Sequence, residues 1–262
     1  MKIGDIIGYM EAWAPLAYQE SYDNAGLQVG DPDAEFRGGL VCLDVTPERV
    51  EEAAACGANL IVSHHPVLFH PLRQVCGRKL SEQIVVKAIK NEIAVYSAHT
   101  NLDNVRSGVN ACLGRLLGLK ETDFLQPNGG FPDAGSGIVG ELEEPMEETG
   151  FLSMVKDRLR LPVLRHSRLL CKPVRRVAAC GGAGGFLLPD AIRAKADVFV
   201  VGEAHYHDFI DFQDNIMIIE TGHYESECLI KSELFARLNE KFGNFAVSEK
   251  ERSPYNYIVK RN

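Results

Sequence analysis

Three short segments of the sequence are rich in side chains that bind metal ions. Each combines a histidine with a neighbouring histidine, aspartate or glutamate. Imidazole with carboxylate suits zinc, iron, manganese, nickel or cobalt, whereas a structural zinc site would draw on paired cysteines. We therefore predict a divalent metal site whose ligands are His64, His65, Asp103, His223 and Glu227.

The number of these side chains indicates two ions. Five protein ligands exceed what one four-coordinate ion with an open position uses. A carboxylate that bridges two ions about 3.5–4 Å apart accounts for the count. We assign the bridge to Glu227, which shares a helix face with His223 if a helix begins there, because the two are four residues apart.

Each metal-type segment follows a predicted buried strand, at residues 59–62, 93–96 and 216–220. In open α/β sheets, loops from several strands converge at the carboxyl ends of the strands, and ligands bind there. Taken singly, each segment has an ordinary explanation: a surface histidine pair, a turn cap at Asp103, or a solvated helix pair. The occurrence of three such segments at equivalent strand ends favours the metal site.

Three further residues are candidates for catalysis. His99 precedes Asp103 by four residues and could transfer a proton or orient a ligand, although a hydrogen-bonded structural histidine is the alternative. Glu203 and His205 follow a strand predicted at 197–201 and could line the cavity, or could form a satisfied loop pair. The glycine-rich residues 181–185 lack the full spacing of a phosphate-binding loop, so we interpret them as a tight packing turn.

Short apolar runs alternate with helical stretches, which predicts an α/β fold. Residues 39–66 and 176–205 share one layout of strand, turn, helix, strand and polar loop. The shared layout has two explanations: either all βαβ units look alike, or an α/β domain is duplicated in this chain. We expect two similar small α/β domains of the three-layer type that are interlinked along the chain. With a Gly- and Pro-rich boundary at 126–136, the first domain would cover 1–128 and 212–262 and carry the metal ligands, and the second would cover 129–211 and close over the site.

Composition excludes several classes of protein. The 262 residues carry a net charge of −8, which argues against direct nucleic-acid binding. No run approaches the ~20 consecutive apolar residues that span a bilayer, so we expect no membrane segment. The seven cysteines never form a C-x-x-C motif, and the first residues do not resemble a signal peptide. We expect a cytoplasmic protein with reduced thiols.

Six segments together resemble one family, the YbgI-type dinuclear metal proteins, also called NIF-three-like proteins or GTP cyclohydrolase I type 2 homologs. They occur in the order expected for that family and extend over nearly the whole chain. The segments are YDNAGLQVGDP at 22–32, IVSHHPVLF at 61–69, SAHTNLDNV at 97–105, CGGAGG at 180–185, VVGEAHYHD at 200–208 and ETGHYESE at 220–227.

The resemblance implies two similar α/β domains and a toroidal homohexamer whose paired metals face an inner cavity. It also implies the same five ligands, residue by residue: the His64–His65 pair, Asp103 of the H-T-x-L-D motif, and His223 with Glu227. Glu225 competes for the last position, and the family spacing of four favours Glu227. The segment from Asp23 to Leu27 matches a family motif whose role the residues alone do not reveal.

Taken together, the sequence indicates a dinuclear-metal-dependent hydrolase that acts on a nucleotide-like or phosphate-bearing small molecule. The family label suggests one specific version, the hydrolytic ring opening of GTP. The alternative is a hexameric metal-binding regulatory or scaffold protein without catalysis, which would saturate its metals with protein ligands. We set aside a phosphoesterase of the D-H-H type, because Ser63 stands where that motif needs aspartate.

Overall fold

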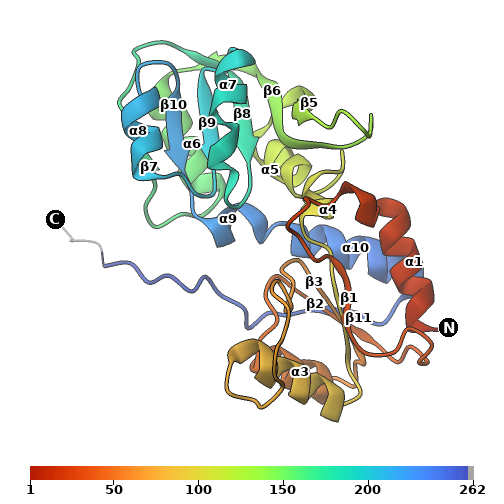
Figure 1. Ribbon diagram of the computed structural model, residues 1–262. Helices are drawn as coiled ribbons and strands as arrows, with labels where there is room; N and C mark the ends of the chain where they lie inside the picture. Colours follow the sequence, from red (N-terminus) through yellow and green to blue (C-terminus); the bar gives the residue numbers. More distant parts are fainter. Residues whose placement is uncertain (259–262) are drawn as a thin grey trace. The chain divides into compact units, whose positions relative to one another are not determined.

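The computed structural model describes residues 1–258 and confirms the predicted α/β class, with two sheets and helices on their faces (Figure 1). The chain divides into two compact units. Unit 1 comprises Met1–Val105 and Ile230–Glu251, and unit 2 comprises Arg106–Leu229 with the described residues after Glu251. Among residues 1–258, no helix combines the length and the apolar character that a bilayer crossing requires.

Unit 1 is built on a five-stranded sheet in the order β1-β4-β3-β2-β11. Strands β2, β3, β4 and β11 run parallel, and β1 pairs antiparallel with β4 at one edge. The inner strands are short, fully buried apolar runs, as expected where helices cover both faces of a parallel sheet. The strands are β1 (Gly26–Val29), β2 (Gly39–Cys42), β3 (Leu60–Ser63), β4 (Ala94–Ser97) and β11 (Phe245–Val247).

Helices cover both faces of this sheet. On one face, α2 and α3 pack into a core with residues of β2, β3 and β4, and on the other side lie α1 and α10 (Figure 1). Helix α2 begins with the Thr46 hydroxyl accepting a hydrogen bond from the Arg49 N–H and with Pro47 in the first turn. The helical segments are α1 (Ile3–Trp13), η1 (Leu16–Tyr18), α2 (Pro47–Ala55), α3 (Leu80–Lys90), α4 (Thr100–Asp103) and α10 (Ile230–Phe242).

Unit 2 is built on a six-stranded mixed sheet in the order β5-β6-β8-β9-β10-β7. Its centre, β8-β9-β10, is parallel, and the other pairs are antiparallel. The strands are β5 (Lys120–Pro127), β6 (Gly135–Met146), β7 (Arg165–His166), β8 (Val174–Cys180), β9 (Val198–Val201) and β10 (Met217–Glu220).

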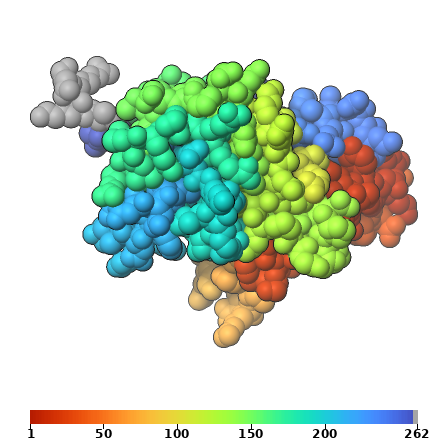
Figure 2. Space-filling view, turned by 90° about the horizontal axis from the view of Figure 1, so that it is seen from above, coloured from red at the N-terminus to blue at the C-terminus, as the bar shows by residue number. Residues whose placement is uncertain are grey.

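Alternate residues of the central strands of unit 2 enter two separate cores. Val198 and Val200 of β9 face α5 and α6, whereas Phe199 and Val201 face α7, because successive side chains of a strand point to opposite faces. Figure 2 shows the outer surface that the yellow-green to light-blue segments of this unit form together. The helical segments are α5 (Val109–Leu117), α6 (Glu148–Arg158), η2 (Gly184–Leu187), α7 (Leu188–Arg193), α8 (Tyr206–Phe212) and α9 (His223–Glu227).

The bounds of the compact units differ from the expected domain division at 128/129 and 211/212. Residues 106–128 belong to unit 2 because β5 forms a hairpin with β6, in which Phe124 pairs with Ile138. The Gly- and Pro-rich segment 126–136 contains the turn of that hairpin. Residues 212–229 belong to unit 2 because β10 pairs with β9. The last residues of the expected first domain, 259–262, lie outside the described residues.

Candidate metal centre

The strand register of unit 1 brings three histidines together. Ser63 at the end of β3 is level with Ser97 at the end of β4, so the residues that follow the two strands emerge at one edge. His64 and His65 follow β3, and His99 follows β4. The ring centroids are 4.9 Å apart for His64 and His65, 5.3 Å for His64 and His99, and 5.6 Å for His65 and His99. One ligand atom from each lies within 4.8 Å of the others, so this group could hold a metal ion.

His64 is held in the tautomer that a metal ligand requires. Its side chain is fully buried, and its Nδ1 lies 2.8 Å from the carbonyl oxygen of Ala98. A carbonyl only accepts, so Nδ1 carries the proton of the neutral ring and Nε2 carries the lone pair. That Nε2 lies 3.6 Å from Oδ1 of Asp103, at the end of α4. Two atoms at this separation can both bind one first-row ion, each at about 2.0–2.2 Å.

The other two imidazoles are oriented by carboxylates. His65 Nδ1 lies 2.8 Å from Oδ1 of Asp44, and His99 Nδ1 lies 2.7 Å from Oδ1 of Asp23. Histidines that bind metals commonly donate their second ring nitrogen to a carboxylate or carbonyl, which fixes the ring and raises its basicity. All three rings of the cluster therefore present Nε2 as the ligand or base atom.

Asp23 remains ionised although its side chain is fully buried. Burial by itself raises the pKa of this carboxyl, but hydrogen bonds from His99 and Thr100 outweigh burial and lower the pKa to about 2. The backbone N–H of Thr100 donates to Oδ2 at 3.0 Å. The negative charge of Asp23 therefore lies beside the His99 ring at all pH values at which the protein is ordinarily studied.

Unit 2 contains a second metal-type group. Helix α9 begins at His223 and ends at Glu227, so the two side chains lie on one helix face. His223 Nε2 is 3.2 Å from Oε2 of Glu227, and its Nδ1 is 3.3 Å from Oε1 of Glu203. Glu227 is buried, with 4% of its surface exposed. Imidazole and buried carboxylate again form a donor set that suits a first-row divalent ion.

The glycine-rich turn after β8 makes close contact with Glu227. Gly182 has φ +59°, and a Cβ added there would lie 2.2 Å from Oε1 of Glu227. The N–H of Gly182 donates to the hydroxyl of Ser226 at 3.1 Å. A side chain at position 182 would therefore displace the carboxylate. The turn acts as the predicted tight packing turn, and the group that it packs against is a candidate ligand.

Among residues 1–258, the remaining candidates, His205 and Glu225, belong to none of the metal-type groups. His205 is the residue before α8, and its backbone N–H donates to Asp208 at 2.7 Å. Glu225 is absent from the metal-type groups found among residues 1–258, and Oε2 of its carboxylate is buried. Two residues that our sequence analysis did not assign, Asp44 and Asp23, orient histidines. The sequence signal for these two aspartates was weak. Asp44 follows a buried strand, and Asp23 lies in the segment 23–27, to which the sequence assigned no role.

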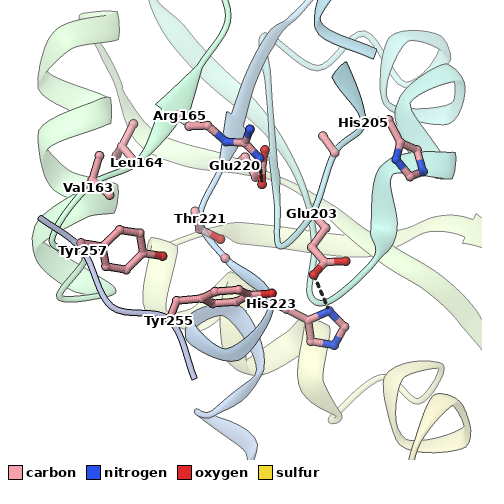
Figure 3. A pocket seen from close by; sticks show the side chains of 12 residues that line it. Val163, Leu164, Arg165, Glu203, His205, Glu220, Thr221, His223, Tyr255 and Tyr257 are labelled. Atoms are coloured by element: carbon pink, nitrogen blue, oxygen red, sulfur yellow. Dashed lines mark hydrogen bonds and ion pairs between the residues drawn. The ribbon is translucent and has the colours of Figure 1, made fainter. Parts of the chain in front are cut away.

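A pocket of about 550 Å³ in unit 2 is lined by both His223 and Glu203 (Figure 3). The dashed line in the figure marks the ion pair between them. His205 and Thr221 also line this pocket, as do Tyr255 and Tyr257 of the C-terminal segment. The second metal-type group therefore borders a space of the size that small molecules occupy.

Comparison with known proteins identifies the family. Residues 1–254 match the family model described as Duf34/NIF3 (NGG1p interacting factor 3). A Clostridium perfringens protein named GTP cyclohydrolase 1 type 2 homolog is 32% identical over 98% of this chain and 100% of its own length. A Lactococcus lactis protein of the same name is 36% identical over 88% of this chain and 89% of its own length.

The fold matches as well. The crystal structure of the Staphylococcus aureus hypothetical protein SA1388 superimposes with a TM-score of 0.90 at 28% identity, covering 98% of this chain and 99% of that one. These matches confirm the resemblance seen in the sequence motifs. Because the family model matches residues 1–254, this chain belongs to the Duf34/NIF3 family.

Proposed function

We propose that the protein is a dinuclear-metal-dependent hydrolase acting on a nucleotide-like or phosphate-bearing small molecule. The proposed ligands of the two divalent ions are His64, His65, Asp103, His223 and Glu227. The observation that carries the proposal is the orientation of the histidines. His64 and His65 both direct Nδ1 to a protein acceptor at 2.8 Å and keep Nε2 for a ligand bond.

The donor set fits two ions of the first transition row, among them zinc, iron, manganese, nickel and cobalt. When bound, such ions polarise substrate oxygens and lower the pKa of bound water, which is the chemistry that hydrolysis needs. The chain's own contribution is to fix the rings of its histidines and to place carboxylates beside them. Asp103 and the buried Glu227 supply the negative charge that balances the cations.

Proton transfer is assigned to His99. The buried carboxylate of Asp23 accepts a hydrogen bond from its Nδ1, so Nε2 keeps its lone pair and can accept a proton. Replacing His99 with Gln should lower kcat about 10²–10⁴-fold while the metal content stays the same. Loss of one ion in this variant would make His99 a ligand instead. Glu203 is held beside His223 and is the second candidate for this role.

The names of the relatives suggest the substrate. The Clostridium perfringens and Lactococcus lactis proteins are called GTP cyclohydrolase 1 type 2 homologs. We therefore propose hydrolytic ring opening of a guanine nucleotide as the specific reaction to test first. We also propose the homohexamer that the resemblance implies, which the molar mass in solution tests directly.

The test is elemental analysis of protein purified without an affinity tag, together with hydrolysis assays on GTP and simple phosphate esters. About two ions per chain with turnover that chelation abolishes is the expected result. About two ions without turnover on either substrate would favour the regulatory or scaffold function. Fewer than about half an ion per chain after reconstitution would contradict the metal site itself.

A further inference from the structure

The pocket of unit 2 has two chemically different sides. In Figure 3, Tyr257 from the C-terminal segment lies near Val163, and the ring of Tyr255 lies between Tyr257 and His223, whereas Glu203 and His205 lie on the other side. The volume of about 550 Å³ is in the range of small-molecule sites, which are about 300–1,000 Å³. An apolar, aromatic side facing a polar side suits a flat ligand with one polar edge.

The aromatic side is accessible. Tyr255 is 53% exposed and Tyr257 is 44% exposed, so their rings can still be covered by a ligand. Exposed aromatic side chains that line a pocket are typical platforms for stacking a heterocyclic base, because every base has a π-face. Partial burial and then the charge of Glu225 raise the pKa of Tyr257, so its hydroxyl stays protonated and can donate a hydrogen bond.

The polar side combines a guanidinium with carboxylates. Arg165 of β7 pairs in register with Glu220 of β10, and their side chains form an ion pair. Glu220 is only 11% exposed, whereas the Arg165 side chain is 69% exposed. The sheet thus holds the guanidinium in place while leaving much of its surface accessible. Guanidinium N–H groups suit carbonyl and ring-nitrogen acceptors of a heterocycle.

The balance of charge disfavours an anion in this pocket. Two carboxylates, Glu203 and Glu220, line it against the single guanidinium of Arg165. A phosphate group would be repelled by the carboxylates, whereas N–H groups of a neutral ring can donate to Glu203, whose side chain is 45% exposed. The pocket therefore matches a neutral heterocycle that has both N–H donors and acceptors on its edge.

We propose that this pocket binds the neutral, planar heteroaromatic ring of a purine-sized small molecule. The ring lies against Tyr255 and Tyr257, and its polar edge faces Arg165 and Glu203. The inference rests on the proposed function, because it names the part of the substrate that is held beside His223. It adds a binding role for Arg165, Tyr255 and Tyr257, which belong neither to the proposed metal site nor to its proton-transfer candidates.

The test is calorimetric titration of the full chain, as purified, with guanosine, whose base has two fused rings and adjacent N–H donors. Ribose 5-phosphate, which lacks the base, is the matched ligand control. Replacing Tyr257 with Ala should weaken guanosine binding about tenfold, and replacing it with Phe should weaken binding less than about threefold. Tyr206→Ala should leave the affinity unchanged, since Tyr206 is 74% exposed and does not line the pocket.

Three results would overturn the inference: no guanosine binding at millimolar concentration, equal affinity in wild type and Tyr257→Ala, or equally tight binding of ribose 5-phosphate. Metal content is measured on the same samples. Absence of guanosine binding in protein that holds its ions contradicts the pocket alone. Guanosine binding in protein that holds no ions supports the pocket and contradicts the proposed hydrolase.

Discussion

His99 donates from Nδ1 to the carboxylate of Asp23 over 2.7 Å, although 76 residues separate the two in the sequence. The same carboxylate accepts the N–H of Thr100, the first residue of α4. Asp23 therefore ties the segment before β1 to the loop after β4, where the three histidines meet. The motif from Asp23 to Leu27, whose role the residues alone did not reveal, thus orients His99, the candidate for proton transfer.

Replacing Asp23 with Asn should lower the free energy of unfolding by about 1–2 kcal/mol at neutral pH. Folding lowers the pKa of Asp23 from 3.8 to about 2, and each pKa unit corresponds to about 1.4 kcal/mol of stabilisation. The Asn amide retains a part of this stabilisation. Because the pKa is lowered by folding, this stabilisation is complete above about pH 4 and is lost as the pH falls towards 2. Urea unfolding of both proteins with a chelator between pH 3 and pH 7 measures the difference. A difference that stays constant down to pH 3 would contradict the lowered pKa.

Replacing Asp44 with Ala should weaken metal binding about 10–100-fold. The carboxylate orients His65 through Nδ1, and loss of such a partner lowers both ring order and basicity. Competition with a coloured chelator gives the affinity. The control is Asp33→Ala, which removes another carboxylate of unit 1 whose partner is the exposed Lys2. Equal affinity losses in both variants would point to a general effect of charge instead of ring orientation.

Glu227→Gln should remove most of the bound metal, whereas Glu225→Gln should leave the metal content nearly intact. Glu227 is buried 3.2 Å from His223, and a neutral amide is a poor ligand for a first-row cation. Glu225 has the same charge and lies on the same helix, so it is a closely matched control. Elemental analysis of the two purified variants decides the assignment. Similar metal loss in both would show that the ligand is wrongly assigned.

Gly182→Ala should destabilise the protein by roughly 2–4 kcal/mol and reduce its metal content. The left-handed φ of +59° costs about 1–2 kcal/mol for alanine, and the new methyl group would overlap Oε1 of Glu227. Gly57→Ala separates these two effects, because Gly57 also has positive φ, +75°, but no atom lies within 4 Å of an added Cβ. That variant should lose about 1 kcal/mol and keep its metal. Full metal binding by Gly182→Ala would show that the carboxylate can move without consequence.

The buried strands could be predicted because they depend on local patterns. Expected strands at 59–62 and 93–96 correspond to β3 (Leu60–Ser63) and β4 (Ala94–Ser97), since a strand covered on both faces is a continuous apolar run. A helix that begins at His223 was the condition for His223 and Glu227 to share a face, and α9 meets that condition. In contrast, β5 (Lys120–Pro127) is largely exposed, so no apolar run predicted it.

The sequence by itself determined the α/β class, the family and the residue types that can bind metal. Only the tertiary structure decided that residues 106–128 and 212–229 belong to unit 2, because strand pairing between β5 and β6 and between β9 and β10 depends on packing rather than on local composition. Only the tertiary structure likewise decided which carboxylates form hydrogen bonds with the histidines. Asp44 lies 21 residues before His65 and Asp23 lies 76 residues before His99, and a hydrogen bond over such a separation forms only when the sheet brings the strand ends level.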